Sequence, residues 1–124
     1  MLDILLVEDD VLIREMMALF LEDEGYEVAG VSNGQEALQY LKTAASLPRL
    51  ILLDLNMPVM TGWKFRKRQQ HDPVLNSIPV VIVSATANVI GQPHVVGEHI
   101  AKPVDFNKLI STVQRYCSTN TGAA

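Results

Sequence analysis

The sequence predicts an α/β fold in which helices cover both faces of a five-stranded parallel sheet. Three short apolar runs, at residues 4–7, 50–53 and 80–83, contain no alternating polar residues, which is typical of strands that are buried on both faces. The segments between these runs repeat apolar residues with the period of a helix. Strands that alternate with helices in this way form a doubly wound sheet with right-handed crossovers.

Two helices are expected in the first half of the chain. The first has an apolar stripe whose members are all expected to face the core: Ile13, Met16, Met17, Phe20 and Leu21. The second is expected to start at Asn33, whose side chain can cap the helix, while Glu36 reaches back to the backbone amide of Asn33. Ala37, Leu38 and Leu41 form the apolar stripe of this second helix.

Two further strands and two further helices complete the expected sheet. Residues 26–29 and 99–101 are predicted as short strands. A helix is expected after Gly62 and before Asp72, with Phe65 turned inward. Asp105 can cap the last helix, whose buried residues would be Leu109, Ile110, Val113 and Tyr116. The natural strand order for this pattern is 2-1-3-4-5, the flavodoxin-like order.

The length and composition predict one globular domain. The chain has 124 residues, of which 48% are hydrophobic, and this suffices for an ordinary core. We expect residues 1–117 to form the domain and the small, polar residues 118–124 to be a flexible C-terminal tail. The net charge of −4 argues against binding to nucleic acid or to an anionic membrane. A single cysteine, Cys117, and the lack of a signal-peptide pattern predict a cytoplasmic protein.

Charged and polar residues gather directly after the predicted strands, at Glu8, Asp9, Asp10, Asp54, Ser84, Lys102 and Pro103. Because parallel strands end at one edge of a sheet, we expect these residues to converge. Carboxylates at close range repel one another unless a cation lies between them, and carboxylate oxygens with room for water suit Mg²⁺. Taken alone, the three successive acids better suit a helix N-terminus, where they complement the helix dipole, and Asp10 is expected to serve in that way.

These residues resemble, in kind and in order, the motifs of the response regulator receiver domain of two-component signalling. The matching segments are residues 6–10 (LVEDD), 54–62 (DLNMPVMTG), 84–85 (SA) and 102–103 (KP). The acceptor segment, with its Met-Pro and Gly, is the most specific of them. The resemblance covers the chain from Asp3 to Cys117. It implies a single-domain receiver of the chemotaxis-regulator type, which is a phosphoacceptor and not an enzyme.

The resemblance implies how phosphoryl transfer would occur. Asp54 would accept a phosphoryl group from a histidine kinase or a phosphotransfer protein, and Lys102 would neutralise charge on that group. A cofactor, Mg²⁺ or Mn²⁺, would be held by the carboxylates of Asp9 and Asp54 and by the backbone carbonyl of Asn56, while Glu8 would bind it through a water.

The resemblance also implies a switch. Ser84 would give its hydroxyl to the phosphoryl group, and His99, where most relatives have Tyr or Phe, would move in concert with it. His99 equally suits an ordinary polar position on an edge strand. The peptide bond between Lys102 and Pro103 would be cis, which proline makes accessible.

One segment departs from the family pattern. Ser84 and Lys102 are 102 − 84 = 18 positions apart, about one helical turn fewer than is usual between these landmarks. Pro93 also interrupts the region in which a fourth helix is expected, residues 86–96. We therefore expect a shortened or irregular fourth helix. Because relatives commonly pair through this region, the chain is expected to be a monomer or a weak dimer.

The third predicted helix carries a basic and aromatic mixture, formed by Trp63, Lys64, Arg66, Lys67 and Arg68. Such a mixture can bind nucleic acid or an acidic partner. A solvated helix face is the simpler interpretation, and the position of Trp63 is left open.

Three alternatives to a phosphorylated receiver can be compared with the sequence. A haloacid-dehalogenase-type enzyme would need a second carboxylate two positions after Asp54, where Asn56 stands. A flavin-binding carrier would need a donor-rich loop after the first strand, where Glu8 and Asp9 stand. A degenerate receiver that acts as a constitutive interaction or dimerisation module is the remaining alternative. In the leading interpretation, the phosphorylated chain signals by binding a downstream protein partner that the sequence does not identify.

Overall fold

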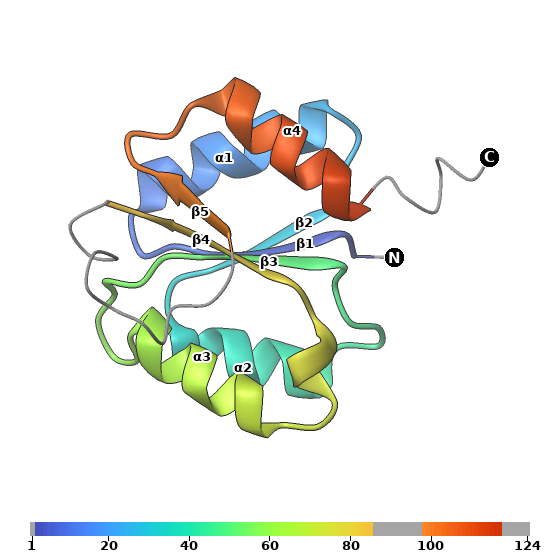
Figure 1. The fold of residues 1–124 in the computed structure, drawn as a ribbon, viewed down its shortest axis with the longest axis vertical. Coiled ribbons are helices and arrows are strands. Elements are labelled where there is room, and N and C mark those ends of the chain that lie inside the picture. Colours follow the sequence, from blue (N-terminus) through green and yellow to red (C-terminus); the bar gives the residue numbers. More distant parts are fainter. Residues whose placement is uncertain (1, 86–97, 118–124) are drawn as a thin grey trace.

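The computed structural model describes residues 2–85 and 98–117 and contains one sheet of five parallel strands (Figure 1). The strands are β1 (Ile4–Val7), β2 (Val28–Val31), β3 (Leu50–Leu53), β4 (Val80–Ser84) and β5 (Glu98–Ala101). Their order is β2-β1-β3-β4-β5, so the predicted flavodoxin-like fold is confirmed. The second strand starts two residues later than predicted, because Ile4 pairs with Val28 and not with Tyr26.

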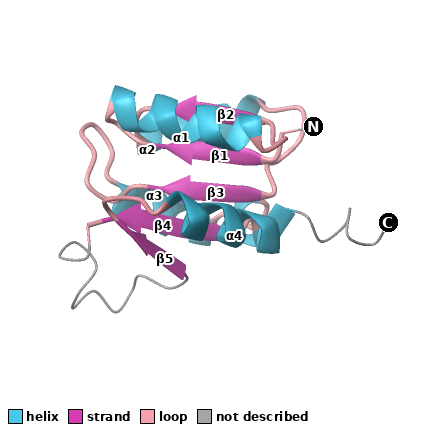
Figure 2. Ribbon diagram, turned by 90° about the horizontal axis from the view of Figure 1, so that it is seen from above, coloured by secondary structure: helices cyan, strands magenta, loops and turns pink. Residues whose placement is uncertain are grey.

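In the part of the chain that the structure describes, four α-helices cover the two faces of the sheet (Figure 1). They are α1 (Val11–Asp23), α2 (Gly34–Thr43), α3 (Gly62–His71) and α4 (Phe106–Cys117), and a short 3-10 helix, η1 (Leu75–Ser77), precedes β4. Helices α1 and α4 pack on one face and α2 and α3 on the other, and the view from above shows the strands running in one direction (Figure 2). The expected fourth helix at residues 86–96 and the expected tail at residues 118–124 lie outside the described residues.

The core has one apolar cluster on each face of the sheet. β1, β3 and β4 are buried along their whole length, and Phe65 of α3 is fully buried, as the apolar runs predicted. The prediction for Met16 was wrong, because this side chain is 55% exposed while its neighbour Met17 is buried. The narrow buried stripe of α1 passes through Met17 and Leu21, so Met16 lies at the solvent side. In α4, Ile110 and Tyr116 are only partly buried.

Asn33 and Asp105 cap their helices as predicted, Asp10 caps a third helix, and one predicted hydrogen-bond partner differs. Asp10 accepts the amide of Ile13, and Asn33 accepts the amide of Glu36. Asp105 accepts amides in the first turn of α4. The Glu36 carboxylate, however, accepts the amide and the hydroxyl of Ser32, one residue before the predicted partner. The chain enters α2 with Ser32 turned toward this carboxylate, which satisfies two donors at once.

No helix in residues 2–85 or 98–117 combines the length and the apolar character needed to span a membrane.

Candidate functional site

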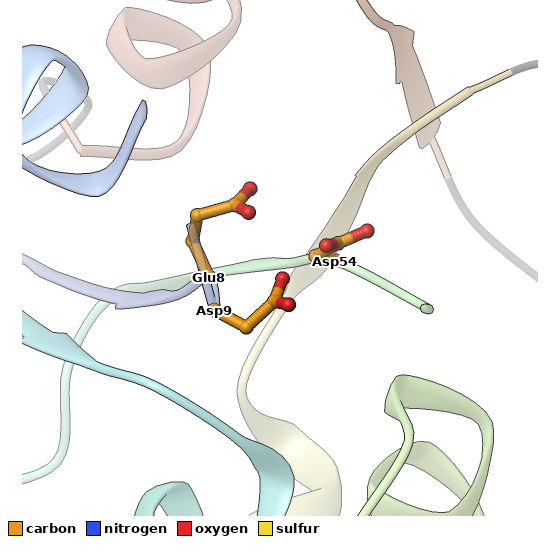
Figure 3. Close-up of side chains that lie close together, drawn as sticks. All are labelled: Glu8, Asp9 and Asp54. Carbon is orange, nitrogen blue, oxygen red and sulfur yellow. The ribbon is translucent and has the colours of Figure 1, made fainter. Parts of the chain in front are cut away.

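Three carboxylates meet at the carboxyl-terminal edge of the sheet (Figure 3). One ligand oxygen from each of Glu8, Asp9 and Asp54 lies within 4.8 Å of the others. The register of the two strands explains why the acids meet. Val7 at the end of β1 pairs with Leu53 at the end of β3, and Glu8 and Asp54 are the next residues. Glu8 and Asp54 are 2% and 5% exposed. The acids line a cleft of about 270 Å³ with, among others, Asn56, Ser84, Ala85 and Lys102.

Lys102 supplies the positive charge in this cleft. Its Nζ donates to Glu8 Oε1 at 2.7 Å and lies 3.4 Å from Asp54 Oδ2. The lysine follows β5, and its amide donates to the carbonyl of Ser84 at 3.1 Å, which ties the end of β5 to the end of β4. The Lys102–Pro103 peptide bond is cis. One ammonium group thus faces three carboxylates, and the cleft keeps an excess of negative charge.

The pKa values in the cleft reflect burial and this excess of charge. Burial raises the pKa of Glu8, and repulsion from Asp54 adds to the effect, so that together they outweigh the hydrogen bond from Lys102. Burial alone would lower the pKa of Lys102, but the hydrogen bond to Glu8 and the attraction of both acids raise it. Lys102 is therefore held in its charged form, while the negative charge on Glu8 is disfavoured until a further cation enters.

The turn between β3 and α3 packs tightly against the backbone of Asp54. A Cβ atom added to Gly62 would lie 2.1 Å from the Asp54 carbonyl oxygen, so only glycine allows this approach. Val59 in the same turn has a φ of 67°, a strained value for a β-branched residue. Asn56 is exposed, and its backbone N–H donates to Asp54 Oδ1 at 3.4 Å. The turn therefore places Asn56 beside the carboxylate of Asp54.

Ser84 and His99 lie next to each other on the neighbouring strands. Ser84 is fully buried at the end of β4. His99 is half-buried, and its Nε2 lies 2.9 Å from the Ser84 carbonyl oxygen. Because a carbonyl only accepts, Nε2 carries the proton in this contact. The structure thus links the two residues proposed for the switch through the backbone of Ser84.

Arg14 is a site residue that the sequence analysis missed. Its Nη1 donates to the carbonyl oxygen of Glu8 at 2.7 Å. The aliphatic part of Arg14 crosses Gly30 of β2, where an added Cβ would come within 3.1 Å of Arg14 Cδ. Arg14 therefore holds the turn that presents Glu8 and Asp9. A basic residue one turn into a helix that follows an acidic strand end is the signal that could have indicated this role.

The donor set of this cleft fits a hard divalent cation. All three acidic side chains offer carboxylate oxygens, which Mg²⁺ and Mn²⁺ prefer, and the described residues place no sulfur or imidazole ligand beside them. The exposed side of Asp9 leaves room for bound water, which Mg²⁺ commonly retains in proteins.

Comparison with known proteins agrees with this geometry. The response regulator receiver domain family matches residues 4–114. An uncharacterized 14.6 kDa protein of Leptolyngbya boryana is 34% identical over 120 residues, which are 94% of this chain and 90% of that protein. Response regulator RR06 of Streptococcus pneumoniae is also 34% identical over 120 residues, covering 91% of this chain but 52% of RR06.

Solved structures share the fold. The receiver domain of a signal transduction histidine kinase from Syntrophus aciditrophicus superimposes with a TM-score of 0.84 at 31% identity, covering 95% of this chain and 91% of that one. Chemotaxis protein CheY4 of Vibrio cholerae gives a TM-score of 0.80 at 31% identity, covering 94% and 98%. The chain spans about half the length of several curated relatives that it matches.

Proposed function

Because the chain belongs to the response regulator receiver domain family, we propose that Asp54 is its phosphoacceptor and that phosphorylation there controls binding to another protein. Members of this family are phosphoacceptor modules of two-component signalling. The observation that carries the assignment is the meeting of Asp54 with two further carboxylates and the Lys102 ammonium at one strand edge. A degenerate receiver is not favoured, because the acids and the lysine converge.

The chemistry is a transfer between two nucleophiles. A carboxylate oxygen of Asp54 attacks the phosphorus of a phosphohistidine and forms an O–P bond. The P–N bond breaks, and its electron pair stays on the histidine nitrogen, which takes up a proton. Lys102 lies 3.4 Å from Asp54 and can balance charge on the phosphoryl oxygens during the transfer. In this way the chain assists its own phosphorylation.

The cleft is expected to need a divalent cation for this reaction. Glu8, Asp9 and Asp54 would hold Mg²⁺ or Mn²⁺ together with the backbone carbonyl of Asn56. The ion would supply the additional positive charge that the phosphoryl oxygens and the three carboxylates require. Arg14 would contribute by holding the carbonyl of Glu8, which keeps the acidic turn in place.

Ser84 and His99 are the proposed switch. Before phosphorylation, His99 is anchored to the Ser84 carbonyl. The Ser84 hydroxyl would turn toward the phosphoryl group, and the shift at the end of β4 would loosen the His99 contact. A His99→Phe variant lacks this contact. When it is phosphorylated, the NMR chemical shifts of residues near Ser84 should therefore change less than in the parent. Equal changes in both proteins would remove His99 from the switch.

The phosphodonor protein is proposed to dock on α1. Leu12, Met16 and Leu19 are 70%, 55% and 71% exposed there. An apolar groove of about 220 Å³ beside α1 is lined by Lys102 and Ile13, which also line the acidic cleft. A histidine kinase or phosphotransfer protein seated on this surface would bring its phosphohistidine to Asp54. Leu12→Lys should slow transfer from phosphorylated histidine kinases while labelling by acetyl phosphate remains unchanged.

A histidine kinase or phosphotransfer protein as phosphodonor implies that this protein is cytoplasmic. The buried, free thiol of Cys117 agrees with this proposal. The haloacid-dehalogenase alternative is disfavoured because Asn56 cannot supply the second carboxylate.

The decisive experiment uses Mg²⁺ and acetyl phosphate, with intact mass spectrometry as the readout. The parent protein should gain the mass of one phosphoryl group, and Asp54→Asn should gain none. Asp23→Asn removes an exposed carboxylate at the end of α1 and is the matched control, which should be labelled like the parent. Labelling of Asp54→Asn, or no labelling of the parent with Mg²⁺ present, would refute the proposal.

A further inference from the structure

The exposed face of α3 carries a cluster of positive charge that phosphoryl transfer does not use. The helix contains Lys64, Arg66, Lys67 and Arg68 but no acidic residue. Lys64, Lys67 and Arg68 are exposed, and no carboxylate in residues 2–85 or 98–117 forms an ion pair with them. Arg66 differs, because it is half-buried and its Nη1 donates to Gln69 at 2.6 Å. The three exposed groups are called the α3 basic face below.

Helix stability accounts for only part of this arrangement, because Arg68 alone of the three lies in the last turn, where the helix dipole favours a cation. Lys64 lies in the first turn, where the positive end of the helix dipole disfavours a cation. Lys67 and Arg68 lie three and four positions further on, and like charges at these spacings destabilise a helix by about 0.2–0.5 kcal/mol per pair. A face selected only for solubility would mix acids with these bases. No acid on α3 compensates this repulsion, and the basic face is therefore a candidate surface for an acidic ligand.

The acid that follows α3 and the acid on the neighbouring helix α2 are already used by the fold. Asp72, which follows α3, accepts the amides of Val74 and Leu75 through Oδ1. Glu36 of the neighbouring helix α2 accepts two hydrogen bonds from Ser32. The surface formed by α2 and α3 therefore keeps a net positive charge, in a chain whose overall charge is −4.

The basic face borders two grooves. One, of about 580 Å³, is lined by Thr61, Trp63, Lys64, Arg66, Lys67, Gln70 and His71. Trp63 is half-buried and packs partly against the core cluster, so its ring offers a fixed apolar wall. The other groove, of about 460 Å³, shares Lys64 and adds Lys42 and Arg68. Positive charges thus surround an apolar contact point, which is the pattern of a site for an acidic and apolar segment.

We propose that the α3 basic face docks an acidic amphipathic helix of a partner protein. Ten helical residues extend about 15 Å, which matches a partner helix of similar length. Carboxylates spaced three or four positions apart on that helix would face Lys64, Lys67 and Arg68. An apolar side chain between them would pack on Trp63. This inference does not depend on phosphorylation of Asp54.

A nucleic acid fits this face less well. The first residue of α3, Gly62, touches the backbone of Asp54, so the basic face ends beside the acidic cleft. An extended polyanion running along α3 would meet Glu8, Asp9 and Asp54 there and would be repelled. A short acidic helix can end before the cleft. The net charge of the chain disfavours a long polyanion further.

The test uses a fluorescein-labelled helical peptide that carries Glu at spacings of three and four residues and one central Leu. Anisotropy measures its affinity, and Trp63, the single tryptophan of the chain, reports contact through its emission. Lys64→Glu and Lys67→Glu should each weaken binding about fivefold, the effect of reversing one exposed charge. Lys108→Glu, the same charge change on α4 across the sheet (Figure 1), should alter binding less than about twofold.

Misfolding is not expected to cause the loss, because Lys64→Glu places an acid in the first turn and a Glu–Arg pair four positions apart with Arg68. Its melting temperature should equal or exceed that of the parent. The proposal fails if Lys108→Glu weakens binding as much as Lys67→Glu, or if a Gln-for-Glu peptide binds equally well. It also fails if an oligonucleotide of equal charge binds more tightly, or if sedimentation shows self-association that Lys67→Glu abolishes, since the occupant would then be a nucleic acid or a second copy.

Discussion

Glu8 and Glu98 each pair with a cation, and their pKa values move in opposite directions. Glu8 lies in the acidic cleft with Lys102, and burial beside Asp54 raises its pKa. Glu98 lies on the outer strand β5, where hydrogen bonds from Arg115 and Tyr116 lower its pKa. In the first pair, Glu8 is almost fully buried, and its partner Lys102 also lies close to a second carboxylate, that of Asp54. The second is balanced and open to solvent.

We propose that this difference separates a charge kept for cation binding, at Glu8, from one kept for structure, at Glu98. Ionised Glu98 stabilises the fold by joining β5 to α4. Ionised Glu8 costs stability in the metal-free protein, because its charge is buried and is not fully compensated. Such a cost persists in proteins where activity requires it. The contrast supports a cation site at the edge of the sheet, and four substitutions can test it.

Gly62→Ala should have the largest effect, because it breaks the packing that holds the acidic cleft. The added Cβ would lie 2.1 Å from the Asp54 carbonyl and 2.7 Å from Leu55 Cα, and backbone cannot yield as a side chain can. We expect a loss of about 3 kcal/mol in the free energy of unfolding, measured by urea denaturation, and a strongly reduced rate of labelling by acetyl phosphate.

Gly30→Ala is the matched control for that change. Its Cβ would meet the flexible Arg14 side chain at 3.1 Å, so the cost should stay below about 1 kcal/mol. If both alanines cost the same, the close approach at Gly62 does not determine the position of Asp54.

Glu8→Gln should stabilise the metal-free protein by between about 1 and 2 kcal/mol at neutral pH. Glutamine keeps the shape and can still accept from Lys102, but it removes a buried negative charge beside Asp54. Added Mg²⁺ should raise the melting temperature of the parent more than that of the variant, because binding to the folded state adds stability in proportion to affinity. Thermal unfolding with and without Mg²⁺ measures both effects. A variant that is less stable than the parent without metal would remove the proposed distinction between the two glutamates.

The sequence predicts some features of the sheet and of the acidic cleft better than others. The strands β1, β3 and β4 were predictable because burial on both faces requires uninterrupted apolar residues. The convergence of Glu8, Asp9 and Asp54 followed from parallel topology. Local sequence patterns were therefore enough to predict the buried strands and the meeting of the acids, because each follows from a single rule of chain geometry.

Features that depend on how elements pack were missed. The hydrogen bond from Arg14 to the Glu8 carbonyl depends on how the Arg14 side chain passes Gly30 of β2, which no spacing rule specifies. Met16 was predicted to be buried because helical periodicity does not define how wide the buried stripe of a helix is. Packing against the sheet decides which residues at the edge of the stripe are covered. The Arg115–Glu98 pair joins residues 17 positions apart, and its existence depends on the docking of α4 against β5.

Val59→Gly tests how much of the stability lost at the acidic edge of the sheet comes from backbone strain and how much from charge. Val59 has a φ of 67° and is 77% exposed, so the substitution relieves strain and removes little packing. Strain of this kind costs about 1–3 kcal/mol, and glycine loses about 0.5–1 kcal/mol of this gain through its flexible unfolded state. We expect a net stabilisation of about 1 kcal/mol in urea denaturation. If Val59→Gly stabilises the Glu8→Gln variant but not the parent, backbone strain and charge at this edge are coupled.

Glu98→Gln should have the smallest effect, and its pH dependence should distinguish the outer pair from the cleft. The pKa of Glu98 is lowered in the folded state by Arg115, so the folded protein binds this proton less readily than the unfolded chain. The stabilisation is therefore fully present above the unfolded value of 4.5 and is lost as the pH falls through the folded pKa. Glu98→Gln should be slightly less stable than the parent at neutral pH, and the two curves should converge in acid. High salt should reduce the neutral difference, because the pair is exposed, but should leave the gain in Glu8→Gln largely intact. A difference between Glu98→Gln and the parent that does not vary with pH would assign the effect to packing instead of charge.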